Sequence, residues 1–328
     1  MSEQKGKMSF ARIYQRFGVV ILLAIVFVAA CFATPNFLTP KNLTNVMRQI
    51  TVITTVGCGL CFVLISANFN IAYDGLIALI GCLSCIVMVH TQNILLSVLT
   101  GLVVGGILGY AYGIFATVFN MPGFIIGLAF DSMACGAILV ITKAKSISRT
   151  KLGNFSVIGQ GYIGGIIPIC VVIMLVIMLI CHILLTRTTF GMKVKAVGGN
   201  REAAMASGVN VKRVIRIVYV IDGLTTGIAS VIYMSRLNSG EPTGGDGVFI
   251  SALTAVCVGG VSVSGGVGGI PGTIVGAAIV GILNNVMNLM NVNAYWQKVV
   301  SGLVILFAIS LDIFVKDSLA KSAKRSIA

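Results

Sequence analysis

Charged residues and tryptophan are scarce in this sequence. Of its 328 residues only 10% are charged and one is tryptophan, whereas 57% are hydrophobic. An ordinary soluble domain carries about 25% charged residues, because its outer surface must meet water. The shortage of charge excludes such a domain and indicates a protein whose outer surface faces lipid.

Acidic residues are rarer still. Nine Asp and Glu stand against 23 Lys and Arg, a formal net charge of +14. The basic residues cluster between apolar runs, as the positive-inside rule predicts, and form no soluble basic surface with interleaved aromatics. We therefore expect no nucleic-acid partner. Nine acids spread this way build no paired-carboxylate or Ser-His-Asp site, so the chain is not expected to be an enzyme.

The nine cysteines are scattered through the apolar runs, and their odd number implies no disulfide framework. The pairs Cys58–Cys61 and Cys82–Cys85 have the spacing of a four-cysteine zinc site. Zinc would require thiolates inside apolar segments, where small thiols usually serve packing. We expect no metal and no cofactor.

Ten apolar runs are long enough, or nearly so, to cross a bilayer, which needs about 20 residues per helix. Nine or eleven spans would also fit. The run after the polar N-terminus has no convincing cleavage site and is interpreted as a retained first span. The sequence thus predicts an all-α membrane protein with about ten transmembrane helices. The runs are roughly 17–34, 49–65, 71–89, 94–119, 122–142, 163–186, 214–234, 248–263, 271–290 and 296–315.

Lys and Arg predict the orientation. Residues 1–16 carry four, the segment Arg187–Arg216 carries seven, and the tail after Leu311 carries four. Six spans before the long segment and four after it place all three groups in the cytoplasm. The basic stretch 143–162 then falls outside, against the rule. We predict a cytoplasmic segment 1–16, a permease domain 17–315 with a cytoplasmic loop 187–213, and a cytoplasmic tail 316–328.

A weak internal repeat is visible when the chain is shifted by about 172 residues. Tyr73-Asp74-Gly75 then falls on Gly245-Asp246-Gly247, each just before an apolar run. A five-span unit repeated once must invert in the membrane, and such 5+5 inverted repeats are a common transporter architecture. The alternative is that two glycine-rich apolar stretches align by chance.

The long basic segment contains a short run of helix-forming residues, Glu202 to Ser207. Asn200 can cap this helix, and Glu202 lies in the first turn, where the helix dipole favours negative charge. Gly208 suits the C-terminal stop. A short helix between two glycine joints at the membrane surface is suited to dock in a groove of another protein.

The same segment resembles the Glu-Ala-Ala-three residues-Gly signature of ABC importer permeases, and its wider form resembles the ribose-type monosaccharide permease family. Other stretches resemble that family too: Pro35–Thr39, Asn42-Leu43, Arg236 with Ser239 and Pro242, Val258–Gly266, Asn284-Asn285 and Gln297. The resemblance implies a type II importer fold in a bacterial inner membrane. It also implies a homodimer or a pair with a similar permease, a cytoplasmic ATPase subunit and a periplasmic sugar-binding protein.

In that family the short helix couples ATP hydrolysis to movement of the permease. The matching positions here are Gly198, Gly199, Asn200, Arg201, Glu202, Ala203, Ala204, Ser207 and Gly208.

The chain departs from the family between the second and third spans. Ala67–Asp74 stands where the family has Gly-Gly-x-Asp-Leu-Ser-x-Gly. Polar groups at membrane depth are costly unless they line a cavity or find partners. We therefore predict a translocation pathway at Asn68, Asn70, Asp74 and Phe124, with a polar turn bonded to its own backbone as the alternative. The altered stretch leaves the particular sugar open.

The loop after the seventh span, with Asn238, Ser239 and Glu241, is predicted to touch the binding protein. Two other functions stay open: an ABC permease for a nucleoside or a furanose-like signalling molecule, and an ion-coupled secondary transporter. An ion-coupled transporter would use carboxylates at midplane, for which Asp74, Asp131 and Asp222 are the candidates.

Overall fold

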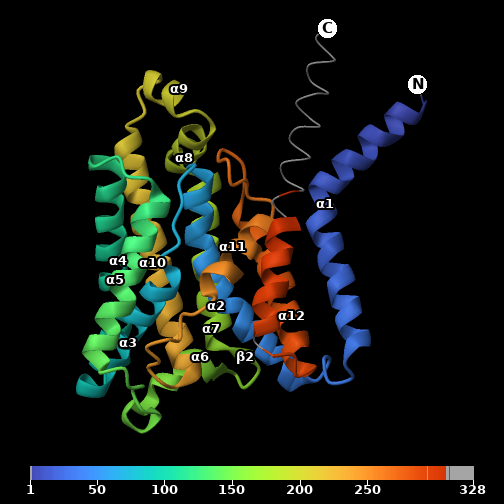
Figure 1. Cartoon of the computed structure of the whole chain (residues 1–328). Helices are drawn as coiled ribbons and strands as arrows, with labels where there is room; N and C mark the ends of the chain where they lie inside the picture. Colours follow the sequence, from blue (N-terminus) through green and yellow to red (C-terminus); the bar gives the residue numbers. More distant parts are fainter. Residues whose placement is uncertain (1, 294, 308–309, 311–328) are drawn as a thin grey trace.

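The chain folds into a bundle of helices, seen in a computed structural model that describes residues 2–293, 295–307 and 310 (Figure 1). Its only sheet within these residues is a hairpin of two two-residue strands, β1 (Tyr162–Ile163) and β2 (Ile167–Pro168). The strands are antiparallel, with Tyr162 opposite Pro168. The predicted all-α class is therefore confirmed.

The helices follow the predicted runs closely. Eight are long: α1 (Ser2–Ala33), α2 (Pro40–Ile65), α3 (Tyr73–Thr91), α4 (Ile94–Val118), α5 (Gly123–Thr142), α7 (Ile169–Thr186), α10 (Val211–Leu237) and α12 (Ile270–Leu289). The shorter ones are η1 (Arg149–Lys151), η2 (Gly153–Phe155), α6 (Ser156–Gln160), α8 (Thr189–Gly199), α9 (Arg201–Ala206) and α11 (Val248–Val258).

Seven of the described helices are long and apolar enough to cross a membrane. Three shorter apolar stretches, Gly18–Ala33, Val248–Val258 and Tyr295–Phe307, match the remaining predicted runs. Each of the ten runs thus has a helical counterpart, while the count of ten spans and the inverted repeat stay predictions. The glycine-rich segment after Val258 separates α11 from α12.

Asparagine side chains explain where two of the long helices start. Asn93 accepts hydrogen bonds from the backbone N–H groups of Leu95 and Leu96 at the start of α4. Asn210 does the same for Arg213 at the start of α10, at 3.0 Å. Such caps satisfy N–H groups that have no partner within the helix.

Helix α10 packs closely on α4, and glycines make this possible. Cβ atoms at Gly105 and Gly109 would run into the backbone carbonyls of Gly223 and Tyr219 on α10. A Cβ at Gly227 on α10 would in turn run into the backbone carbonyl of Gly101. These glycines, which recur at every fourth residue of α4, therefore serve a contact within the chain.

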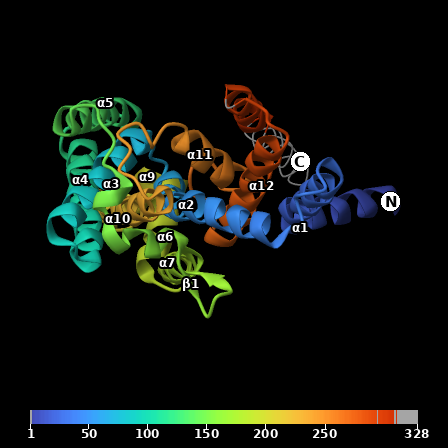
Figure 2. The same ribbon diagram turned by 90° about the horizontal axis from the view of Figure 1, so that it is seen from below.

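Helices α2 and α10 lie in the middle of the bundle, between α4 and α5 on one side and α12 and α1 on the other (Figure 2). The outer helices expose apolar side chains, such as Ile107 on α4, Val140 on α5 and Leu179 on α7. That pattern suits helices that face lipid.

The two ends of the bundle differ. Helices α8 and α9 project from one end, hereafter the α9 end, and α1 also begins there (Figure 1). Helix α6 and the β1–β2 hairpin lie at the opposite end. The 27 residues of α10 run from one end to the other, about 40 Å.

Candidate functional site

The short helix predicted at Glu202–Ser207 is present as α9, Arg201–Ala206. The side-chain oxygen of Asn200 accepts a hydrogen bond of 2.9 Å from the backbone N–H of Ala203, as expected of the cap. Gly208 follows with a φ of +80°, a left-handed conformation that favours glycine. Both predicted ends of the helix are therefore built as the sequence indicated.

Most of the α9 surface is free within the described chain. Of the predicted coupling residues Gly199 to Ser207, all but Ala204 are exposed, and Ala204 alone packs inward with 4% of its surface exposed. Met205 on the same helix is 52% exposed. The helix thus presents an open surface at the end of the bundle.

Helix α8 connects α9 to the core. A Cβ at Gly198 would collide with the backbone carbonyl of Ile65, at the end of α2, whereas Gly199 has open space. The same Ile65 carbonyl accepts a hydrogen bond of 2.8 Å from the backbone N–H of Gly266. The projection therefore sits directly on the end of α2 and on the loop before α12.

The predicted loop 187–213 is mostly helical; the sequence predicted α9 within it but not α8. The α8 helix occupies Thr189–Gly199, and α10 begins at Val211, so Lys212 and Arg213 belong to α10. Arg216, in the next turn, donates a hydrogen bond of 2.7 Å to the hydroxyl of Thr117 on α4. Two short helices, rather than a flexible loop, hold the predicted coupling residues.

Asn70 lies in a buried polar cluster. Its amide donates to a carboxylate oxygen of Asp222 at 2.7 Å, and the hydroxyl of Tyr73 donates to the other oxygen at 2.7 Å. Asp222 is 1% exposed and lies midway along α10. The cluster joins the segment before α3 to the central helix.

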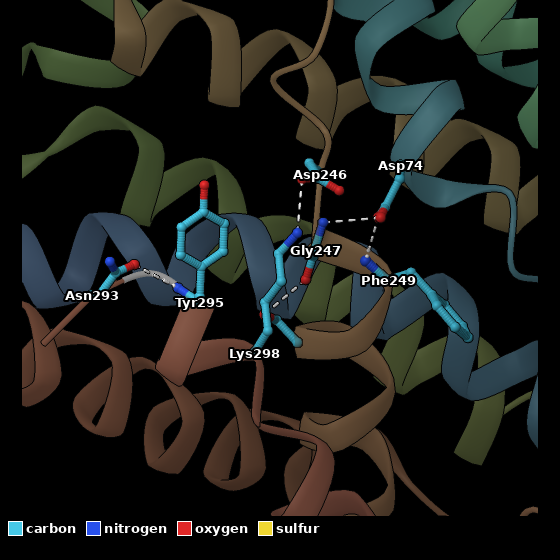
Figure 3. Close-up of polar contacts among 8 residues, drawn as sticks. Asp74, Asp246, Gly247, Phe249, Asn293, Tyr295 and Lys298 are labelled. Carbon is cyan, nitrogen blue, oxygen red and sulfur yellow. Dashed lines mark hydrogen bonds and ion pairs between the residues drawn. The ribbon is translucent and has the colours of Figure 1, made fainter. Parts of the chain in front are cut away.

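Asp74 has a different role, at the start of α11. Its two carboxylate oxygens accept hydrogen bonds of 2.9 and 2.7 Å from the backbone N–H groups of Gly247 and Phe249 (Figure 3). The segments Tyr73–Gly75 and Gly245–Gly247, which the sequence shift had aligned, therefore touch each other. Beside them Lys298 and Asp246 form an ion pair of 2.9 Å.

Asp131 repeats this arrangement one helix away. Its carboxylate accepts a hydrogen bond of 2.7 Å from the backbone N–H of Gly75 at the start of α3. The three carboxylates that an ion-coupled transporter could use, Asp74, Asp131 and Asp222, are thus all engaged in hydrogen bonds that hold helices together.

The predicted pathway residues do not share one site. Asn68 and Phe124 line a cavity of about 470 Å³ near the α9 end, together with Asn120 and Arg201. Asn70 and Asp74 are engaged in the contacts described above and do not line it. Two of the four predicted residues therefore line a cavity, and the other two make hydrogen bonds between helices.

A second polar cavity, also of about 470 Å³, lies at the opposite end of the bundle, where α2 begins and α10 and α12 end. It adjoins a smaller cavity of about 270 Å³, with which it shares Gln49, Arg236 and Asn288. The wall of the larger cavity is formed by Asn42, Asn45, Arg48, Gln49, Gln160, Arg236, Asn285, Asn288 and Leu289. Several of these residues had marked the family resemblance, but their meeting in one place was not predicted. The sequence signal that could have indicated this cavity is the group of asparagines 284, 285 and 288 on one otherwise apolar helix.

The loop predicted to contact a binding protein lies at this same end. Asn238 ends α10 in a left-handed conformation and is 5% exposed, so its side chain faces the interior. Ser239 and Glu241 are partly exposed, and the Glu241 carboxylate accepts a hydrogen bond of 2.7 Å from Ser146. Of these three predicted residues, only Ser239 and Glu241 have exposed surface that a partner could contact.

Across the described residues, no three His, Cys, Asp or Glu side chains come together as a metal site. Cys58 and Cys61 lie on α2, Cys82 and Cys85 on α3, and all four are buried free thiols.

Comparison with known proteins places this geometry in context. Residues 42–309 match the family model described as the branched-chain amino acid transport system permease component. The chain is 36% identical to the ribose import permease protein RbsC of Bacillus subtilis, over 95% of this chain and 96% of that protein. It is 31% identical to the L-arabinose transport system permease protein AraH of Escherichia coli, over 98% and 96% of the two chains. It is also 31% identical to the D-allose transport system permease protein AlsC of that organism, over 95% of each. No solved structure is significantly similar to the chain.

Proposed function

The chain belongs to the family of branched-chain amino acid transport permease components, and from this membership we propose that it is the membrane-spanning subunit of an ABC importer for a monosaccharide. Its relatives are import permeases for ribose, L-arabinose and D-allose, and the similarity to them extends over nearly the whole chain. The protein is a multi-pass transport subunit of the inner membrane, and the resemblance makes a type II importer fold the expected one.

The observation that carries the coupling mechanism is the exposed, doubly capped helix α9, seated through Gly198 on the end of α2. A partner that moves α9 would push on α2 and α10 together, because α9 contacts the bundle through α8 and leads into α10. We propose that a separate ATPase subunit binds this surface in the cytoplasm. Its ATP hydrolysis would drive the permease.

The opposite end of the bundle then faces the periplasm. We propose that a periplasmic sugar-binding protein docks there, with Ser239 and Glu241 at its edge. A second permease copy or a similar chain would complete the pathway. The N-terminus would be cytoplasmic, since α1 begins at the α9 end. The tail 316–328, for which the sequence predicts the same side, lies outside the described residues.

Reconstitution tests the proposal. The chain is co-expressed with its cognate ATPase and binding protein, and uptake of radiolabelled D-ribose, L-arabinose and D-allose into proteoliposomes is measured. We expect uptake of at least one sugar that requires ATP. Uptake driven by an ion gradient without the ATPase would overturn the proposal in favour of a secondary transporter.

A pair of variants tests the docking surface. Met205→Glu adds a charge to the exposed face of α9 and should abolish co-purification of the ATPase, while Thr150→Glu, exposed at the opposite end, should not. Unchanged co-purification with Met205→Glu would place the ATPase elsewhere.

A further inference from the structure

The polar cavity at the end opposite α9 contains hydrogen-bonding groups that are left unused. Buried groups of this kind normally have partners, because an unpaired buried donor or acceptor costs about 1–3 kcal/mol. Among the described residues, neither the Nε of Arg48 nor the Oε1 of Gln49 has one. The side chains of Asn45, which is exposed, and of Asn284, which is half-buried, also line the cavity walls and make no hydrogen bond within this part of the chain.

The unused groups are of both kinds. The Nε–H of Arg48 is a donor, the Oε1 of Gln49 is an acceptor, and the amides of Asn45 and Asn284 are both. A hydroxyl group can donate and accept at once, whereas a carboxylate or phosphate can only accept. A ligand bearing several hydroxyls therefore fits this mixture better than a simple anion.

The two arginines of the cavity are already held in place. Arg48 donates to the backbone carbonyl of Gln160 at 2.6 Å, and its guanidinium lies over the Tyr162 ring, 4.9 Å from the centroid. Arg236 lies over the Tyr233 ring at 5.4 Å. Ring faces stabilise a cation without a counter-ion. The arginine charges thus have a structural explanation that does not require an anionic ligand.

The cavity also has a continuation into the bundle. The smaller cavity is lined by Asp246, Gly247 and Ser251 at the start of α11, and by Gln297. Gln297 donates to the side chain of Asn288 at 2.8 Å and closes one wall. The smaller cavity therefore extends from the shared residues to Gly247, whose backbone N–H donates to Asp74. The volumes of about 470 and 270 Å³ lie near the range of about 300–1,000 Å³ that is usual for small-molecule sites.

We propose that these two adjoining cavities, which meet at Gln49 and Asn288 and have Asn284 in the wall of the smaller one, form the site where the permease itself binds a neutral polyhydroxylated sugar as it enters from the periplasmic side. The inference rests on the proposed function for the direction of entry. It moves the main sugar contacts away from Asn68, Asn70, Asp74 and Phe124.

The chain carries a reporter for this site. Trp296 is its only tryptophan and directly precedes Gln297. The purified full chain in lipid nanodiscs is titrated with D-ribose, L-arabinose and D-allose, and Trp296 fluorescence is recorded. We expect saturable binding of at least one sugar, with the signal abolished in Trp296→Phe.

Two variants and a matched control complete the test. Gln49→Leu and Asn284→Leu remove the polar groups with little change of volume and should weaken binding at least tenfold. Asn154→Leu, an exposed amide outside the cavity at the same end, should bind as the wild type does. Unchanged affinity in both cavity variants, absence of binding by all three sugars, or tighter binding of D-gluconate than of D-ribose would overturn the proposal.

This assay contains no ATPase and no binding protein, so it can fail or succeed independently of the importer function. Absence of sugar binding with normal ATPase co-purification would contradict only the proposal that the cavity binds sugar. Sugar binding without ATP-dependent uptake would contradict the proposal that the chain is part of an ATP-driven importer.

Discussion

Asn42 and Asn285 exchange two hydrogen bonds between their side-chain amides, of 2.9 and 2.8 Å, although 243 residues separate them. Both residues are buried, and they join the start of α2 to the last turns of α12. Asn42 also donates to the backbone carbonyl of Phe37 at 2.9 Å. A paired amide of this kind holds the cavity wall in one geometry, because neither side chain can move without leaving the other unpaired.

Removing both partners of this pair should cost less than the sum of the two single removals. Asn42→Leu and Asn285→Leu are each expected to destabilise the chain by about 1–3 kcal/mol, because an amide is left buried without its partner. The double variant should be less destabilised than the sum of the singles. Thermal unfolding in detergent measures this, with Asn154→Leu as the control. Additive losses would show that the two amides do not depend on each other.

The close packing of α4 on α10 gives a second prediction. Gly105→Val would force a side chain into the backbone of Gly223 and should lower the melting temperature strongly and reduce expression in the membrane. Gly136→Val on α5 is the matched control, since a Cβ there meets nothing within 4 Å. Equal behaviour of the two variants would argue against the contact.

The neighbouring glycines before α9 are expected to differ. Gly198→Ala places a methyl group against the Ile65 carbonyl and should displace α8 from α2, which reduces ATP-dependent uptake. Gly199→Ala has open space and should fold normally. Uptake and ATPase co-purification are measured for both variants. Reduced uptake with normal co-purification indicates that α8 no longer contacts α2 correctly, whereas loss of co-purification indicates that the ATPase no longer binds. Normal uptake with Gly198→Ala would show that the seat on α2 is not needed for coupling.

Local sequence rules carried the prediction of the fold a long way. The apolar runs, the Asn200 cap and the Gly208 stop depend on neighbouring residues, and the structure has a helix at each run and both helix ends as predicted. The α8 helix was missed because Gly198 and Gly199 have low helix propensity. Gly198 is accommodated in the helix because its lack of a side chain allows contact with the end of α2. Sequence could not show that Asn42, Arg48, Arg236 and Asn288 share one cavity, because this depends on how α2, α10 and α12 pack.

The same limit explains the pathway prediction. Asp74 looked like a pathway residue because a carboxylate at membrane depth must find either a cavity or a partner. Its partners are backbone N–H groups 173 and 175 residues away, at the start of α11. No pattern near Asp74 reveals them, although the weak repeat brought the same two segments into register.

Substitution of Asp74 separates a structural role from ion coupling. Asp74→Ala leaves two N–H groups at the start of α11 without an acceptor and should destabilise the chain by about 0.5–2 kcal/mol, as loss of a helix cap does. Asp74→Asn keeps one acceptor oxygen and should retain much of the stability and of the ATP-dependent uptake. Asp246→Asn weakens an exposed ion pair with Lys298 and should change the stability of the chain little. A carboxylate that binds a coupling ion behaves differently, because its charge is needed in every cycle. If Asp74→Asn folds as stably as the wild type but abolishes uptake, the structural role assigned to Asp74 is wrong.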